Sequence, residues 1–167
     1  EPMITAEQIA ERIRTLAADI RQAYGDETIT CIGVLKGSVI FLADLVRAIP
    51  GEVELEFLGV SSYHGTHSTG EVRITHDLHA AIDGKHVLVV EDILDTGLTL
   101  AYLKRALEVR NPASLRIVTL LDKPSRRTTP VDVDFVGFTI PDRFVVGYGL
   151  DLDQRFRHIP YIGVYHP

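Results

Sequence analysis

The chain has 167 residues, of which 46% are hydrophobic and 24% are charged, and its net charge is −6. This length allows one domain with a buried core, and the acidic balance argues against a nucleic-acid partner held mainly by phosphate contacts. The apolar runs are too short to span a membrane. Cys31 is the single cysteine, so an intrachain disulfide is excluded, and charged residues interrupt the amino-terminal segment where a signal peptide would be apolar. We therefore expect a cytoplasmic protein.

Capping and periodicity signals predict a helix near the start of the chain. Thr5 and Gln8 have the spacing of a helix capping box. Apolar residues then recur at helical spacing as far as Tyr24, and Gly25 ends the helix. Cys31 lies in the apolar segment that follows, so we expect a buried thiol rather than a nucleophile.

The rest of the chain alternates apolar strands with amphipathic helices. Strands are expected at residues 30–35, 53–61, 72–75, 85–90, 115–121, 134–139, 144–146 and 161–164, and helices at residues 39–49 and 99–110. This alternation predicts right-handed βαβ units and a mainly parallel twisted sheet flanked by helices, which is an α/β fold. We expect residues 1–167 to form a single domain, with a small lobe built from the two ends of the chain.

The segment from Ser62 to Gly70 has a different composition from the rest of the chain. It consists almost entirely of glycine, hydroxyl-bearing and histidine residues, which predicts a mobile surface loop. We expect a lid at about residues 62–74. His64 and His67 lack a third ligand nearby, so we expect them to be solvated rather than bound to a metal.

The most informative stretch runs from Val87 to Thr99 and reads VLVVEDILDTGLT. Its four leading apolar residues predict a buried strand, which runs into the adjacent carboxylates Glu91 and Asp92. Asp95 then opens a small-residue loop before the next helix. In open α/β sheets, ligands bind where the carboxyl end of a strand meets a helix amino terminus, and such a loop suits a phosphate. The carboxylates suit sugar hydroxyls, Mg²⁺, or both.

Simpler interpretations of the same residues have to be weighed. Glu91 and Asp92 alone would fit a solvated loop, and Asp95 could serve as a helix N-cap. The triplet Asp95, Thr96 and Gly97 also matches the aspartic proteases. That assignment requires an all-β chain, and the helical periodicities argue against it.

The stretch from Val87 to Thr99 resembles the phosphoribosyl pyrophosphate motif of the type I phosphoribosyltransferases. Beyond it, the chain resembles the family of hypoxanthine and hypoxanthine-guanine phosphoribosyltransferases over nearly all of its length from Ile32 onward. Four further stretches carry this resemblance: residues 34–37 (VLKG), residues 62–63 with 68–70, Lys123, and residues 141–157, which begin PDRFVVGY. The resemblance implies a glycosyltransferase of purine salvage. Such an enzyme joins a purine base to phosphoribosyl pyrophosphate, with Mg²⁺ as cofactor, and forms IMP or GMP and pyrophosphate.

The resemblance assigns the 5-phosphate to the loop after the central strand. Main-chain N–H groups and the hydroxyls of Thr96 and Thr99 are the expected donors. Gly97 lets the main chain approach the phosphate closely. Leu98 stands where some relatives carry lysine, which removes one positive charge but leaves the main-chain donor in place.

The three carboxylates of the motif receive separate roles from the resemblance. Glu91 and Asp92 are expected to bind the ribose hydroxyls and, together with Asp151, to hold Mg²⁺. Carboxylates near the anomeric carbon also favour an oxocarbenium-like transition state. Asp95 is expected to be the general acid/base that exchanges a proton with a purine ring nitrogen.

Base recognition is assigned to residues further along the chain. Lys123 is expected to donate to the 6-oxygen of hypoxanthine or guanine and so to reject adenine, although a surface lysine beside Asp122 is the simpler reading. Phe144 is expected to stack on the purine, with a core phenylalanine as the alternative. The main chain of Val145 would contact the edge of the base.

Pyrophosphate is assigned to a second loop and to two other segments. Lys36 and Gly37 resemble the family's pyrophosphate loop, in which a non-proline cis peptide bond turns an N–H group toward the ligand. From the residues alone, an ordinary strand-to-helix turn would be expected there. Ser62 and Tyr63 of the lid and the guanidinium of Arg157 are the other expected contacts.

A regulatory protein of the same fold is the alternative function. Such a protein would bind phosphoribosyl pyrophosphate or nucleotides without catalysis and act on nucleic acid. The chain lacks an added basic face or DNA-binding module, and it retains Asp95 and the lid. We therefore expect an enzyme with no nucleic-acid or membrane partner, and a homodimer or homotetramer on family grounds. Arg126 and Arg127 are expected to be solvated, although either could reach pyrophosphate.

Overall fold

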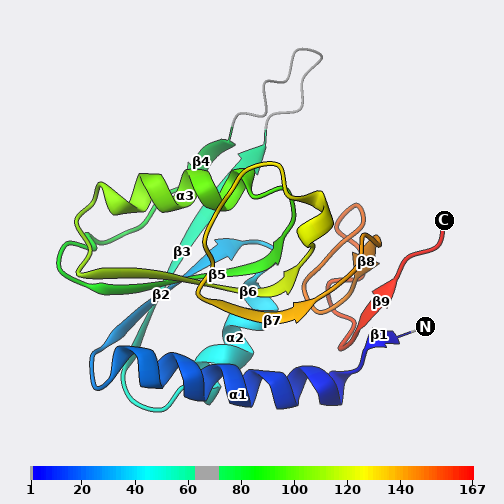
Figure 1. The fold of residues 1–167 in the computed structure, drawn as a ribbon, viewed down its shortest axis with the longest axis horizontal. Coiled ribbons are helices and arrows are strands. Elements are labelled where there is room, and N and C mark those ends of the chain that lie inside the picture. Colours follow the sequence, from blue (N-terminus) through cyan, green and yellow to red (C-terminus); the bar gives the residue numbers. More distant parts are fainter. Residues whose placement is uncertain (1, 63–71) are drawn as a thin grey trace.

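The computed structural model describes residues 2–62 and 72–167, which form two β-sheets with helices packed around the larger one (Figure 1). The strands are β1 (Pro2–Ile4), β2 (Ile29–Leu35), β3 (Val53–Ser62), β4 (Val72–His76), β5 (His86–Leu94), β6 (Ser114–Asp122), β7 (Phe135–Thr139), β8 (Val145–Val146) and β9 (Ile162–Val164). The helices are α1 (Ala6–Tyr24), α2 (Val39–Ala48), α3 (Leu98–Glu108) and the short 3₁₀ helix η1 (Pro124–Arg126).

The larger sheet has six strands in the order β4-β3-β2-β5-β6-β7. β4 runs antiparallel to β3, and the other neighbouring pairs are parallel. In β2, Ile29 lies opposite Val53 of β3 and His86 of β5. Six of the seven residues of β2 are buried, as expected for a central strand covered on both faces. The predicted parallel α/β sheet is confirmed.

Helices cover both faces of this sheet. α1 and α2 lie against one face, and α3 lies against the other (Figure 1). The helical spacing predicted near the amino terminus buries Ile13, Leu16 and Ile20 of α1 in the first core, whereas Leu103 and Leu107 of α3 enter the second. Within the described ranges, no helix has the length and apolar character needed to cross a membrane.

The predicted boundaries of α1 are confirmed. Thr5 donates its main-chain N–H to Gln8 Oε1 at 2.8 Å, and Gln8 returns its N–H to Thr5 Oγ1 at 3.1 Å, which completes the capping box. The helix ends at Gly25, whose φ of 62° falls in the region that glycine adopts most readily.

A small antiparallel sheet joins the two ends of the chain, in the strand order β1-β9-β8. Ile4 pairs with Ile162, and Val146 pairs with Gly163. Ile4, Val145 and Ile162 belong to the same buried cluster as α1, so this lobe shares its core with the main sheet. The predicted lobe is confirmed, although β1 itself was not among the predicted strands.

The central strand is longer than the sequence predicted. We expected it to end at residue 90, where the charged residues begin, but β5 continues to Leu94. β6 supplies a partner over this extension, because Ile93 pairs with Leu121 and Leu94 pairs with Asp122. Glu91 and Asp92 therefore belong to the strand rather than to a loop.

The connections from β2 and β5 run in opposite directions along the sheet. The chain leaves β2 through α2 to reach β3 on one side, and it leaves β5 through α3 to reach β6 on the other. This divergence leaves a crevice at the carboxyl ends of the two adjacent strands, which is where ligands bind in open α/β sheets.

Cys31 is 0% exposed in β2, and burial raises the pKa of its thiol to about 12. Because the thiolate is the reactive form, we expect a thiol-specific reagent at pH 8 to leave the native protein unlabelled. The same reagent should label one thiol per chain after denaturation in guanidinium chloride. Rapid labelling of the native protein would show that β2 is not the buried central strand described above.

Candidate active site

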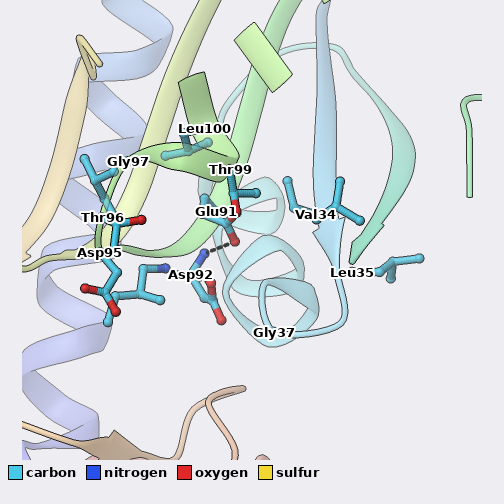
Figure 2. A pocket seen from close by; sticks show the side chains of 13 residues that line it. Val34, Leu35, Gly37, Glu91, Asp92, Asp95, Thr96, Gly97, Thr99 and Leu100 are labelled. Atoms are coloured by element: carbon cyan, nitrogen blue, oxygen red, sulfur yellow. Dashed lines mark hydrogen bonds between the residues drawn. The ribbon is translucent and has the colours of Figure 1, made fainter. Parts of the chain in front are cut away.

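A cleft of about 260 Å³ opens where the carboxyl ends of β2 and β5 diverge. The predicted site residues that line it are Gly37, Glu91, Asp92, Asp95, Thr96, Gly97 and Thr99. Figure 2 shows Glu91 and Asp92 in the middle of this cleft, with Asp95 on one side and Val34 and Leu35 on the other. Two loops that are far apart in the sequence therefore face each other across the carboxylate pair.

The carboxylate pair is partly buried at the end of β5. Glu91 is 7% exposed, and its Oε1 accepts the main-chain N–H of Asp92 at 2.9 Å (Figure 2). Asp92 Oδ1 accepts the N–H of Ile93 at 2.7 Å. Burial, and then the negative charge of Asp92, raise the pKa of Glu91 well above its ordinary value. Hydroxyl donors or a cation placed against the pair would stabilise its ionised form.

Gly37 leaves room for one of these carboxylates. A Cβ atom at this position would collide with Asp92 Oδ2, so the Asp92 side chain packs directly against the turn after β2. The peptide bond between Leu35 and Lys36 is cis, which confirms the expectation for this turn. The Lys36 side chain is exposed and its Nζ lies 3.3 Å from Gln154 Oε1.

The loop between β5 and α3 has the form expected of an anion site. Gly97 is the N-cap of α3 with a φ of 93°, and Leu98 is the first helical residue. The first-turn N–H groups of a helix have no intrahelical acceptor, and they face a ligand at this end. Thr96 and Thr99 line the same cleft. Asp95 stands two residues before the N-cap, so the alternative that Asp95 caps the helix is wrong.

The connection between β6 and β7 packs against this loop through main-chain hydrogen bonds. Thr128 and Thr129 both donate their main-chain N–H groups to the carbonyl oxygen of Thr96, at 2.9 and 3.0 Å. A Cβ atom at Gly97 would collide with the carbonyl oxygen of Thr129. The loop and the connection are therefore in direct main-chain contact, which only glycine permits at that position.

Two arginines of this connection interact with neighbouring residues. The expectation of a solvated side chain was wrong for Arg127, which is half-buried and ion-paired, whereas Arg126 is exposed as expected but also forms an ion pair. Arg127 Nε donates to the carbonyl oxygen of Asp95 at 3.2 Å, and its guanidinium forms an ion pair with Asp122. Arg126 Nε lies 3.1 Å from Asp95 Oδ1. The short helix η1, which was not predicted, turns both side chains back toward the loop. Pro124 at its first position was the available signal.

Lys123 and Phe144 each depart from their simpler interpretation. Lys123 is 7% exposed, so it is not a surface lysine, and its main-chain N–H donates to the carbonyl oxygen of Leu94 at 2.9 Å. Phe144 is 50% exposed, so it is not a core residue, and it meets Tyr165 edge to face at a ring distance of 6.0 Å. Val145, the next residue, is buried.

Asp151 and Arg157 form a separate polar group. Asp151 Oδ2 lies 3.4 Å from Arg157 Nη2 and accepts the main-chain N–H of Gln154 at 2.9 Å. Arg157 Nη1 donates to the carbonyl oxygen of Gly149 at 2.6 Å. A Cβ atom at Gly149 would collide with the carbonyl oxygen of Gly37, which places this segment against the turn after β2.

The three predicted metal ligands do not form a ready-made cage. In the part of the chain that the structure describes, no three His, Cys, Asp or Glu side chains gather closely enough to hold a metal ion. Mg²⁺ commonly binds through one or two carboxylates and completes its shell with water and substrate phosphate oxygens. Glu91 and Asp92 fit that requirement without a third protein ligand.

Some predicted residues lie outside the described ranges. Tyr63, His64 and His67 belong to this group, as does most of the predicted lid at residues 62–74. Ser62 ends β3. Residues 72–74 form part of β4, which confirms the predicted hairpin arm after the loop.

Comparison with known proteins agrees with this geometry. Residues 3–153 match the family model described as a phosphoribosyl transferase domain. The hypoxanthine-guanine phosphoribosyltransferase of Bacillus subtilis (strain 168) is 48% identical over 166 residues, which cover 99% of this chain and 92% of the relative. The Staphylococcus aureus (strain Mu50) protein of the same name is 46% identical over 168 residues, which cover 100% of this chain and 94% of that protein.

Solved structures show the same similarity in three dimensions. A crystal structure of a hypoxanthine-guanine phosphoribosyltransferase from Bacillus anthracis superposes with a TM-score of 0.95 at 43% identity, covering 99% of this chain and 98% of that one. The chain belongs to the phosphoribosyltransferase family. Within it, the chain groups with the hypoxanthine-guanine phosphoribosyltransferases. The α/β architecture also excludes the aspartic protease alternative.

Replacing Gly97 by alanine should destabilise the fold more than the same change at Gly84. Both glycines have positive φ, 93° and 69°, so alanine at either position costs about 1–2 kcal/mol of backbone strain. A Cβ atom at Gly84 meets no atom within 4 Å, whereas one at Gly97 collides with the Thr129 carbonyl. Urea unfolding of Gly97→Ala and Gly84→Ala would measure the difference. Equal losses would contradict the contact between the loop and residues 128–129.

Proposed function

We propose that the chain catalyses purine salvage by transferring the 5-phosphoribosyl group from phosphoribosyl pyrophosphate to hypoxanthine, guanine or both. The products are IMP or GMP and pyrophosphate. The observation that carries this proposal is the pair Glu91–Asp92 beside the helix-start loop at residues 95–99, at the switch point of the sheet. The named relatives give no support to the regulatory alternative.

The two sides of the cleft suit the two ends of the sugar donor. The 5-phosphate would bind to the main-chain N–H groups of the loop and to the Thr96 and Thr99 hydroxyls, with Leu98 contributing its main-chain donor. Glu91 and Asp92 would accept hydrogen bonds from the ribose 2- and 3-hydroxyls. A sugar held at both ends in this way presents its anomeric carbon to the remaining space of the cleft.

The reaction needs one bond to form, one to break and one proton to move. A purine ring nitrogen bonds to the anomeric carbon as the bond from that carbon to the pyrophosphate oxygen breaks. Positive charge develops on the ribose, and the neighbouring carboxylates stabilise it. Asp95 accepts the proton that the base gives up, and it returns a proton in the reverse direction.

Recognition of the base would come from the end of β6 and from the small lobe. Lys123, a residue that is 7% exposed, would donate from its ammonium to the 6-oxygen of hypoxanthine or guanine. Adenine carries an amine at that position, so two donors would face each other. The exposed ring of Phe144 would stack on the purine, and the main chain of Val145 would contact its edge.

Pyrophosphate would occupy the side of the cleft formed by the turn after β2. Gly37 lines this side, and Lys36 precedes it in the same turn with an exposed side chain. The guanidinium of Arg157 lies on the neighbouring segment, and Ser62 and Tyr63 are further expected contacts. Glu91, Asp92 and Asp151 are the proposed magnesium-binding residues, with Asp151 acting directly or through water. When bound, Mg²⁺ would neutralise charge on the departing pyrophosphate.

We further propose that residues 1–167 act as one phosphoribosyltransferase domain and assemble as a homodimer or homotetramer. Val39 and Ile40 on α2 are 38% and 37% exposed. Ile40 lines an apolar groove between α1, α2 and the segment around Tyr148 that a second copy could cover. Light scattering would measure the assembly directly. A cytoplasmic location, and the absence of nucleic-acid and membrane partners, stay predictions.

Nucleotide formation tests the proposed function. The protein is mixed with phosphoribosyl pyrophosphate, Mg²⁺ and one purine at a time, and nucleotide is followed by absorbance. We expect turnover with hypoxanthine, guanine or both, none with adenine, and loss of turnover when Mg²⁺ is chelated. The absence of turnover with every base would favour the regulatory alternative.

Replacing Asp95 by asparagine tests the acid/base assignment. Asparagine keeps the shape of the side chain but cannot accept the proton, so kcat should fall about 10²-fold or more. Affinity for the nucleoside monophosphate should change little, because the main-chain donors of the loop remain. Calorimetric titration with the nucleotide would report binding beside the kinetic measurement, and unchanged kcat would remove Asp95 from this role.

A further inference from the structure

Arg126 joins two parts of the site that the chain keeps far apart in sequence. Its Nε donates to Asp95 Oδ1 at 3.1 Å, and its Nη1 lies 3.8 Å from Asp142 Oδ2. Asp142 stands two residues before Phe144, in the segment proposed to contact the purine. One guanidinium therefore lies between the proposed proton carrier and the base-binding segment.

The local structure fixes where this guanidinium stands. Arg126 is the last residue of η1, and its main-chain N–H donates to the carbonyl oxygen of Lys123 at 3.1 Å. The next residue, Arg127, stabilises the turn through an ion pair with Asp122 and a hydrogen bond to the carbonyl oxygen of Asp95. The turn that carries Arg126 is thus attached at both ends to residues of the site.

We propose that Arg126 is a positioning residue that orients the Asp95 carboxylate for proton exchange with the purine. This inference rests on the proposed role of Asp95 as general acid/base. With Oδ1 engaged by the guanidinium, the second oxygen, Oδ2, receives no hydrogen bond from the described residues and is the one that exchanges the proton. A carboxylate held in one rotamer meets the ring nitrogen more often than a freely rotating one.

The exposed fractions of the Arg126 and Asp95 side chains indicate which measurement should respond to the loss of their ion pair. The side chains of Arg126 and Asp95 are 50% and 41% exposed, and ion pairs at such exposure contribute little to folding stability. The effect should therefore fall on turnover rather than on the melting temperature. Arg126 also lies near Asp142 of the base-binding segment, but at the longer distance of 3.8 Å. We therefore expect removal of the Asp142 carboxylate to lower turnover less than removal of the Asp95 carboxylate.

A set of variants tests the proposal in the complete enzyme. We expect Arg126→Ala to lower kcat about tenfold while the KM for phosphoribosyl pyrophosphate stays within about twofold. Arg126→Lys, or guanidinium ion added to Arg126→Ala at non-denaturing concentration, should restore part of the rate. Arg110→Ala is the matched control, since Arg110 forms a two-point ion pair with Asp77, at 2.9 and 3.1 Å, outside the residues assigned to the site. Its kinetics should match those of the unaltered enzyme.

The double variant separates this proposal from the function on which it rests. If Arg126 acts through Asp95, then Arg126→Ala should have no further effect in the Asp95→Asn background. A further tenfold loss there would overturn the positioning role. A raised KM for phosphoribosyl pyrophosphate with unchanged kcat would also overturn it, and would assign Arg126 to pyrophosphate binding. Full activity of Asp95→Asn would instead show that the acid/base assignment has failed, and the positioning role with it.

Discussion

The main-chain contact between residues 128–129 and Thr96 is the constraint on which the rest of the site depends. Two N–H groups donate to one carbonyl oxygen, and Gly97 adopts a φ of 93° beside them. This contact decides where α3 begins, and therefore where its first-turn N–H groups lie. It also places Asp95 within reach of Arg126. A phosphate loop held by its own side chains alone would lack this support from a neighbouring strand connection.

The carboxylate pair is unfavourable in the free protein and favours ligand binding for the same reason. Glu91 is almost completely buried and has Asp92 as its neighbour, which raises its pKa and disfavours the doubly charged pair in the free protein. A ligand that brings hydroxyl donors or a cation relieves this cost. In the proposed arrangement, this would favour the binding of ribose and of Mg²⁺ at Glu91 and Asp92. Neither carboxylate forms a salt bridge with a described residue, whereas Asp95, Asp122 and Asp151 each have an arginine partner.

The sequence predicted most of the fold because its signals are local. The capping box at Thr5, the helical periodicity of α1 and the apolar strands each depend on neighbours within a few residues. The end of β5 was placed too early, since charged residues normally mark the end of a buried strand and only the pairing with β6 carries it to Leu94. The roles of Arg126 and Arg127 were missed for a related reason. Their partners, Asp95 and Asp122, come from other elements, and the turn that aims them is three residues long.

In the proposed arrangement, different strand ends bind different parts of the substrates, which explains why this topology suits the reaction. In the proposed arrangement, β5 supplies the phosphate loop and the carboxylates, β2 leads to the pyrophosphate turn, and β6 ends at Lys123. Each group therefore reaches the cleft from a separate connection, and the parallel sheet between them holds their spacing. Arg126 lies on the connection that follows Lys123, so the residue proposed to recognise the base and the residue proposed to orient the proton carrier share one short turn. Displacement of that turn should disturb base selection and proton transfer together. It should also disturb the proposed sugar-phosphate site, because Thr128 and Thr129 of the same connection donate to the Thr96 carbonyl oxygen of the phosphate loop.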